Sequence, residues 1–163
     1  MLKFKLKIDA LLKWFLVVLM GAMTLNVLWQ VFTRFIMQNP SSFTEELARY
    51  MLVWVGILGA SYVAGQKMHL AIDLLPSKLT GKPKIYINLF IELCILIFAL
   101  AVMVIGGFRL VTITLTLNQI SAALQIQLGY VYAVLPISGM LISYYSIFFI
   151  LGGLKELKNV SYK

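Results

Sequence analysis

The sequence predicts an all-α membrane protein with four transmembrane helices, both termini in the cytoplasm, and an amphipathic interfacial helix between the second and third spans. Its 163 residues are 61% hydrophobic and only 12% charged. Soluble globular chains are about 45 to 50% apolar and about 25% charged. A chain this short cannot bury so much apolar surface by itself, so lipid or a partner must cover part of it.

The first span follows from a long gap between charges, because ions are excluded from hydrocarbon and a helix needs about 20 residues to cross it. Lys13 and Arg34 bracket twenty uncharged residues, which predicts a span over 14–33. The run is longer than the apolar core of a signal peptide and has no clear cleavage site, so we expect it to stay uncleaved.

The second span occupies 43–66 in this interpretation. Asn39-Pro40 ends the first helix, and Ser42 with Glu45 has the spacing of a capping box, so the second helix is predicted to begin near Phe43. Seventeen uncharged residues then separate Arg49 from Lys67.

The third span lies between Lys84 and Arg109, where Glu92 is the one charged residue. Helical spacing of apolar residues continues beyond Arg109, so we expect the third helix, 85–117, to extend outward from the membrane.

The fourth span is predicted over 129–154. No charge occurs in 110–154, which is too long for one span, and its polar middle indicates a neutral turn before the last helix. Pro136 predicts a kink in that helix.

Residues 68–79 form the predicted interfacial helix. Apolar residues repeat there with helical spacing, which is typical of a helix lying flat on the membrane. His69 and Asp73 share another face, where we expect a local hydrogen bond and no catalysis.

Lysine distribution predicts the orientation, since the cytoplasmic side carries the excess of basic residues in short loops. Eleven lysines lie in the two tails and the second connection, whereas three arginines lie in the first and third connections. The net charge of +8 therefore indicates topology and attraction to anionic membrane lipids, with no nucleic acid as partner.

The first connection brings four charges together at the predicted outer mouth. They are Arg34, Glu45, Glu46 and Arg49. Two interpretations remain open: a solvated cap with little net energy, or a docking surface for a partner outside the membrane.

Six residues are candidates for contact with another subunit. Gly56, Ala60 and Ala64 form a small-residue stripe, which lets a helix approach closely either within this chain or in a second one. Trp29 and Trp54 each lie five residues from an arginine and are predicted at one depth, as in an aromatic belt. Glu92 is either a structural or subunit contact, or the coupling acid of an ion or proton relay.

Catalytic and cofactor chemistry are not indicated. One cysteine, Cys94, cannot form an internal disulfide, and one cysteine with one histidine gives no convincing zinc set. The spans lack clustered histidines, cysteines or paired carboxylates. We therefore expect neither an enzyme nor a bound cofactor or metal.

Several fragments together resemble a known family. They are the run from Phe43 to Trp54 (FTEELARYMLVW), Leu58-Gly59-Ala60, His69 to Leu75 (HLAIDLL), Ser121 to Gln127 (SAALQIQ) and Tyr132 to Pro136 (YAVLP). The chain resembles the small membrane subunit, DctQ/SiaQ-like, of tripartite ATP-independent periplasmic (TRAP) transporters, with closest similarity to the sialic-acid branch. Ala122 stands where the family's loop pattern has proline.

The resemblance implies a division of labour in the bacterial inner membrane. A periplasmic binding protein captures an organic acid, and a large membrane subunit moves it with sodium by an elevator motion. The small subunit would brace the scaffold of the large one and help to dock the binding protein. The alternative is a self-sufficient four-helix transporter or channel that uses Glu92 as its coupling acid.

Overall fold

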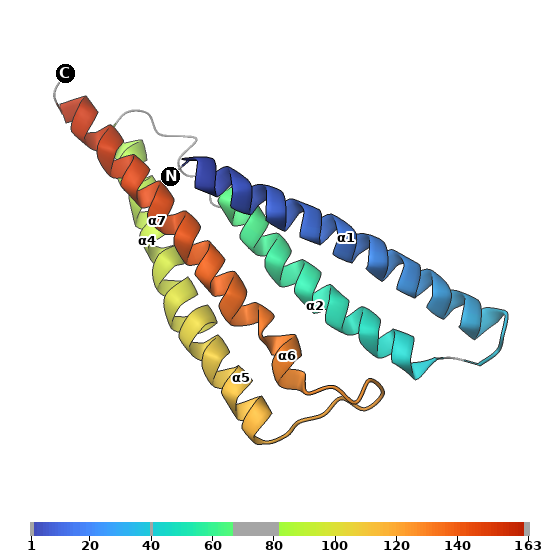
Figure 1. Cartoon of the computed structure of the whole chain (residues 1–163). Coiled ribbons are helices and arrows are strands. Elements are labelled where there is room, and N and C mark those ends of the chain that lie inside the picture. The colour runs from blue at the N-terminus through green and yellow to red at the C-terminus, as the bar shows by residue number, and fades with distance from the viewer. Residues whose placement is uncertain (1, 40, 67–81, 162–163) are drawn as a thin grey trace. The chain divides into compact units, whose positions relative to one another are not determined.

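The computed structural model describes residues 2–39, 41–66 and 82–161, and the regular elements within these ranges are helices (Figure 1). In chain order they are α1 (Leu2–Phe35), α2 (Ser42–Gly65), α4 (Lys82–Phe98), the π-helix η1 (Ala99–Gly106), α5 (Gly107–Thr116), α6 (Leu128–Tyr132) and α7 (Val134–Ser161).

Within the described ranges, four helical stretches are long and apolar enough to cross a membrane. They are Lys5–Phe35, Ser42–Gly65, Lys82–Thr116 and Leu128–Lys158. The described residues thus confirm an all-helical fold with four helices that are long and apolar enough to span a membrane. The location of the termini stays a prediction, and the interfacial helix over 68–79, with His69 and Asp73, lies outside the described residues.

The chain divides into two compact units. The first comprises Met1–Tyr62 with Arg109–Val134, and the second comprises Val63–Phe108 with Leu135–Lys163. The single membrane domain expected from the sequence stays a prediction.

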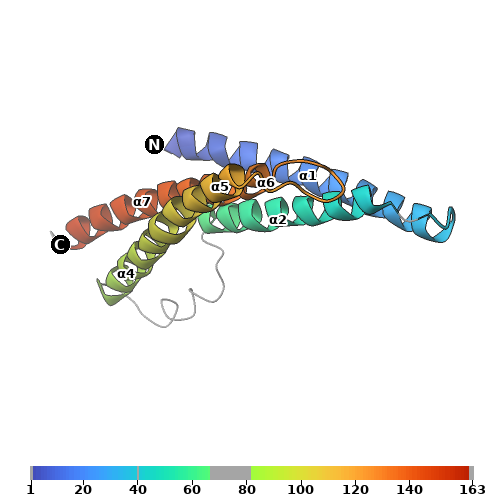
Figure 2. The same cartoon turned by 90° about the horizontal axis from the view of Figure 1, so that it is seen from below.

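In the first unit, α1 and α2 run antiparallel and lie side by side in both views (Figures 1 and 2). The amide nitrogen Nδ2 of Asn26 donates to the carbonyl oxygen of Thr44 at 2.8 Å, and the rings of Phe15 and Trp54 are 6.4 Å apart. These two contacts fix the register of the antiparallel pair. Asn26 lies beside Thr44, and Phe15 lies beside Trp54, at the same height along the two helix axes.

The register places Arg49 level with the middle of the uncharged stretch of α1, near Gly21. Trp54 is level with Phe15, so it lies about 14 residues, or roughly 21 Å at 1.5 Å per residue, from the level of Trp29. The predicted common depth of the two tryptophans is therefore wrong. It assumed that Arg34 and Arg49 are level, but α2 begins at Ser42 and extends well beyond Arg49 toward the hairpin end.

The connection from α5 to α6 folds back on itself. Ile120 and Gln127 form an isolated antiparallel bridge, and the N–H groups of Ser121 and Leu128 donate across the loop at 2.9 Å. Asn118 and Gln125 have positive φ angles of 46° and 57°, which let the chain reverse direction within a few residues.

The helix predicted over 129–154 is interrupted at Ala133, between α6 and α7. Pro136 explains the break, because proline has no N–H to donate and its ring clashes with the carbonyl four residues earlier. That carbonyl belongs to Tyr132, the last residue of α6. The predicted kink is confirmed as an interruption.

In the second unit, α7 packs closely against the π-helix η1. A Cβ added to Gly139 would lie 2.7 Å from Cβ of Met103 and 2.9 Å from Cγ2 of Val104. No side chain larger than hydrogen fits at Gly139 unless one of the two helices shifts. The π-helix, which spans eight residues, was not predicted from the sequence.

Candidate functional site

One face of α2 carries the most specific contacts of the first unit. Glu46, Tyr50 and Trp54 recur every fourth residue and therefore share a side of the helix, which continues to the buried Leu58. The hydroxyl of Tyr50 donates to Oε1 of Glu46 at 2.6 Å, and Nε1 of Trp54 donates to the carbonyl oxygen of Val131 at 3.0 Å. This face thus joins α2 to α6.

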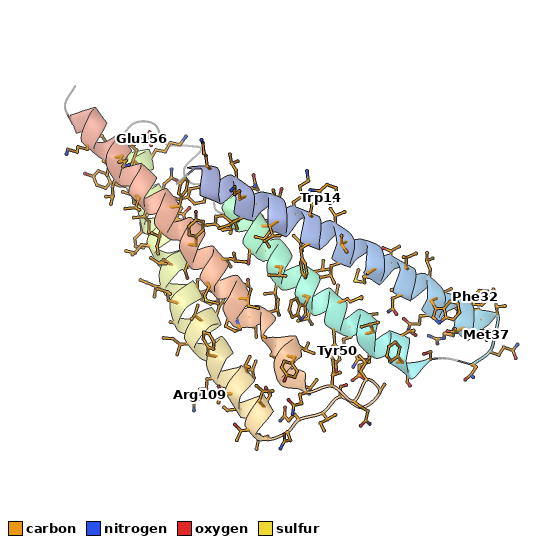
Figure 3. The ribbon with its side chains drawn as sticks, in the orientation of Figure 1. Trp14, Phe32, Met37, Tyr50, Arg109 and Glu156 are labelled. Carbon is orange, nitrogen blue, oxygen red and sulfur yellow. The ribbon has the colours of Figure 1, made fainter. Side chains whose placement is uncertain are left out.

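Glu46 holds the tip of the α5–α6 loop. Its Oε2 accepts hydrogen bonds from the backbone N–H groups of Ala123 at 2.7 Å and Leu124 at 2.8 Å, while Oε1 accepts from Tyr50. Figure 3 shows the side chain of Tyr50 between α2 and this loop. We call Glu46, Tyr50, Ala123 and Leu124 the loop clasp. Its three donors occupy both carboxylate oxygens, so Glu46 fixes the loop to α2.

The predicted outer mouth separates into two parts. Glu45 accepts a hydrogen bond from Nη2 of Arg49 at 3.3 Å, and these side chains are 64% and 68% exposed. Glu46, by contrast, belongs to the loop clasp. Among the described residues Arg49 thus pairs with Glu45 and not with Glu46, because neighbouring residues on a helix point in different directions. The assignment of the four residues to an outer mouth stays a prediction.

The capping box predicted from Ser42 and Glu45 is also wrong. The helix α2 begins at Ser42, one residue earlier than expected, and the hydroxyl of Thr44 donates to the carbonyl of Ser41 at 2.9 Å. Glu45 is paired with Arg49 instead of reaching back to the helix start.

A cavity lies between the end of α1 and the start of α2. It has a volume of about 210 Å³ and is lined by Gln30, Arg34, Ser41, Ser42 and Glu45. The guanidinium of Arg34 lies 5.9 Å from the ring centre of Phe35, and no carboxylate among the described residues is within ion-pair distance of it. This cavity brings Arg34 and Glu45 of the predicted mouth to one place.

The predicted subunit-contact residues differ in their surroundings. In the stripe, Gly56 and Ala60 are exposed, and a Cβ added to Gly56 would meet nothing within 4 Å. Ala64 is half-buried, as is Glu92 on α4. Trp29 is exposed and stacks on Phe32 at 5.7 Å.

The loop clasp was missed from the sequence. The repeat of Glu46, Tyr50, Trp54 and Leu58 at four-residue intervals indicated a shared face, and one polar group at each of the first three positions was a sign of specific contacts. The partner segment, 121–124, is apolar except for Ser121, and it binds Glu46 through the backbone N–H groups of Ala123 and Leu124, which a sequence does not reveal.

Among residues 2–39, 41–66 and 82–161, no group of three or more His, Cys, Asp or Glu side chains could hold a metal ion. The polar groups described above instead hold helices and a loop together.

The four apolar helices and the fixed loop define an integral membrane protein. Residues 23–156 match the family of "Tripartite ATP-independent periplasmic transporters, DctQ component", and the chain belongs to this family. The resemblance inferred from the sequence is thereby confirmed.

Three relatives are similar over parts of their length. The Vibrio cholerae "Sialic acid TRAP transporter small permease protein SiaQ" is 30% identical over 54% of this chain and 51% of that protein. The Haemophilus influenzae "Sialic acid TRAP transporter permease protein SiaT" is 33% identical over 42% of this chain and 12% of that protein. A "Putative TRAP transporter small permease protein" from Haemophilus influenzae is 25% identical over 77% of this chain and 76% of that protein. The chain thus spans about half the length of SiaQ and a small part of SiaT.

Proposed function

We propose that this chain is the small permease subunit of a sodium-coupled TRAP transporter in the bacterial inner membrane. Its substrate is an organic acid, and two relatives whose names specify sialic acid support N-acetylneuraminate. Both termini face the cytoplasm, as the concentration of lysines in the tails and the second connection supports.

The small subunit braces the scaffold of a large membrane subunit in this proposal. The observation that carries it is the register of α1 and α2, because the exposed Glu45–Arg49 pair lies level with the uncharged middle of α1. Charged groups at membrane depth are stable where protein or water covers them. Lipid around α1 and a protein partner along α2, with water reaching the exposed pair from the periplasmic side, satisfy both helices.

Low burial also supports a partner. Within the apolar parts of the first three spans, only 6%, 11% and 6% of residues are buried inside the chain. Gly56 and Ala60 present a smooth exposed face on α2, which is suited to close approach by another helix. We assign that face to the large subunit.

Reconstitution into proteoliposomes tests which components sodium-driven uptake requires. We expect sodium-driven uptake of N-acetylneuraminate only when this chain, its large subunit and the periplasmic binding protein are all present. Uptake by this chain alone would support the alternative, a self-sufficient transporter with Glu92 as coupling acid.

The variant Glu92→Gln, made in the assembled transporter, distinguishes a structural role of Glu92 from a role as coupling acid. A structural or contact role predicts nearly unchanged uptake and unchanged dependence on sodium, because glutamine preserves the size and polarity of the side chain. Lost sodium or proton coupling in a complex that assembles normally would identify Glu92 as the coupling acid.

The exposed part of the outer mouth, Arg34, Glu45 and Arg49, helps to dock the binding protein. Replacing Glu45 with Lys reverses one charge there, so we expect a higher concentration of binding protein for half-maximal uptake. Glu156→Lys is the matched control, since Glu156 is also exposed but lies in the last turns of α7 (Figure 3). Equal concentration requirements for the two variants would remove Glu45 from the docking surface.

A further inference from the structure

The cavity at the end of the α1–α2 hairpin is a small, half-open pocket. Its volume of about 210 Å³ is below the range of about 300 to 1,000 Å³ typical of pockets for drug-sized ligands. Every lining residue has a polar side chain: Gln30, Arg34, Ser41, Ser42 and Glu45. Such a lining on a chain that is 61% hydrophobic requires a specific explanation.

The lining carries one charge of each sign. Arg34 presents a guanidinium, the group best matched to phosphate oxygens, and no described carboxylate forms an ion pair with it. Glu45 presents a carboxylate that accepts from Arg49 through Oε1. A ligand with a phosphate and a separate ammonium group would match both Arg34 and Glu45.

The surroundings of the cavity are apolar. Phe35, Ile36 and Met37 follow Arg34 directly, and each is more than half exposed. Figure 3 shows Phe32 and Met37 at this end of the hairpin, and Phe32 stacks with Trp29 at 5.7 Å. Aromatic side chains of this kind are enriched at membrane–water interfaces. An amphiphile with a small polar head fits a polar cavity with such a rim.

We propose that this cavity binds the headgroup of a phospholipid with a primary ammonium, namely phosphatidylethanolamine. The phosphate contacts Arg34, the ammonium contacts Glu45, and the acyl chains lie along the apolar rim. The site shares Arg34 and Glu45 with the docking surface proposed above. Lipid retention is measured without the binding protein, so the two proposals are tested separately.

Native mass spectrometry of the full chain in complex with its large subunit tests the site. The complex is delipidated and then exposed separately to phosphatidylethanolamine and phosphatidylglycerol. We expect the unchanged complex to retain phosphatidylethanolamine preferentially and Arg34→Gln to lower that retention about tenfold, the effect of one charge-assisted hydrogen bond. Arg109→Gln, the same change at an exposed arginine on α5, should retain it normally.

Two further variants and a competition with phosphate test which groups of the lipid the cavity binds. Glu45→Gln should shift the preference toward phosphatidylglycerol, because the anionic partner of the ammonium is gone. Arg34→Lys keeps the positive charge and should retain phosphatidylethanolamine. Excess inorganic phosphate should not displace the lipid if the rim contributes. Equal retention by Arg34→Gln and the unchanged chain, displacement by phosphate, or preference of the unchanged complex for phosphatidylglycerol would overturn the proposal.

Discussion

Two adjacent glutamates have different surroundings in this protein. Glu45 is exposed and pairs with Arg49, whereas Glu46 is half-buried and accepts three hydrogen bonds, two of them from the α5–α6 loop. Exposed ion pairs of the first kind contribute little to stability. A carboxylate that satisfies several backbone donors fixes a local conformation. Glu46 is therefore the residue that determines where the loop lies.

Replacing Glu46 with Ala should release the tip of the loop, because the N–H groups of Ala123 and Leu124 lose their acceptor. Hydrogen–deuterium exchange of these amides should become severalfold faster. Glu45→Ala is the matched control and should leave their exchange unchanged. Equal exchange in both variants would show that the loop is held by other contacts.

At the scale of elements, the pairing of α7 with the π-helix depends on the absence of a side chain at Gly139. Met103 and Val104 come within 3 Å of the position that a Cβ would occupy. Gly152 lies on the same helix, but a Cβ there would meet nothing within 4 Å. The two glycines therefore allow a comparison of the same substitution in packed and open surroundings.

Gly139→Ala should destabilise the protein by about 1 to 3 kcal/mol, the usual range for overpacking. Gly152→Ala should stabilise it by up to about 1 kcal/mol, because alanine favours a helix more than glycine does. Thermal unfolding in detergent measures both changes. A similar shift for the two variants would contradict close packing at Gly139.

The first three spans were predictable from charge spacing, because hydrocarbon excludes charged residues, and the fourth from the uncharged polar stretch that precedes it. Pro136 likewise indicated the interruption of the last helix. The loop clasp was not predictable, because it uses backbone donors of Ala123 and Leu124. Nothing in the sequence pattern of 99–106 indicated the π-helix, which packs against Gly139 of a distant segment. The register of α1 and α2 was also hidden, since charge gaps along single helices do not reveal which residues are level.

At the scale of the whole molecule, the exposed stripe on α2 requires a covering surface. Ala60→Leu should lower copurification with the large subunit, because the larger side chain prevents close approach of a partner helix. Ala101→Leu, at an exposed alanine on η1, controls for added bulk. If both variants copurify equally with the large subunit, the stripe faces lipid instead.

The offset between Arg34 and Arg49 has a consequence for the bilayer itself. Helix axes lie about 10 Å apart and spans tilt by at most about 40°, so even the largest tilt leaves roughly 9 Å of an offset in depth of about 20 Å. The two arginines then still lie at different depths. Where no protein covers α2, hydrocarbon chains beside it must be compressed. Lipids with short acyl chains fit this side of the hairpin best.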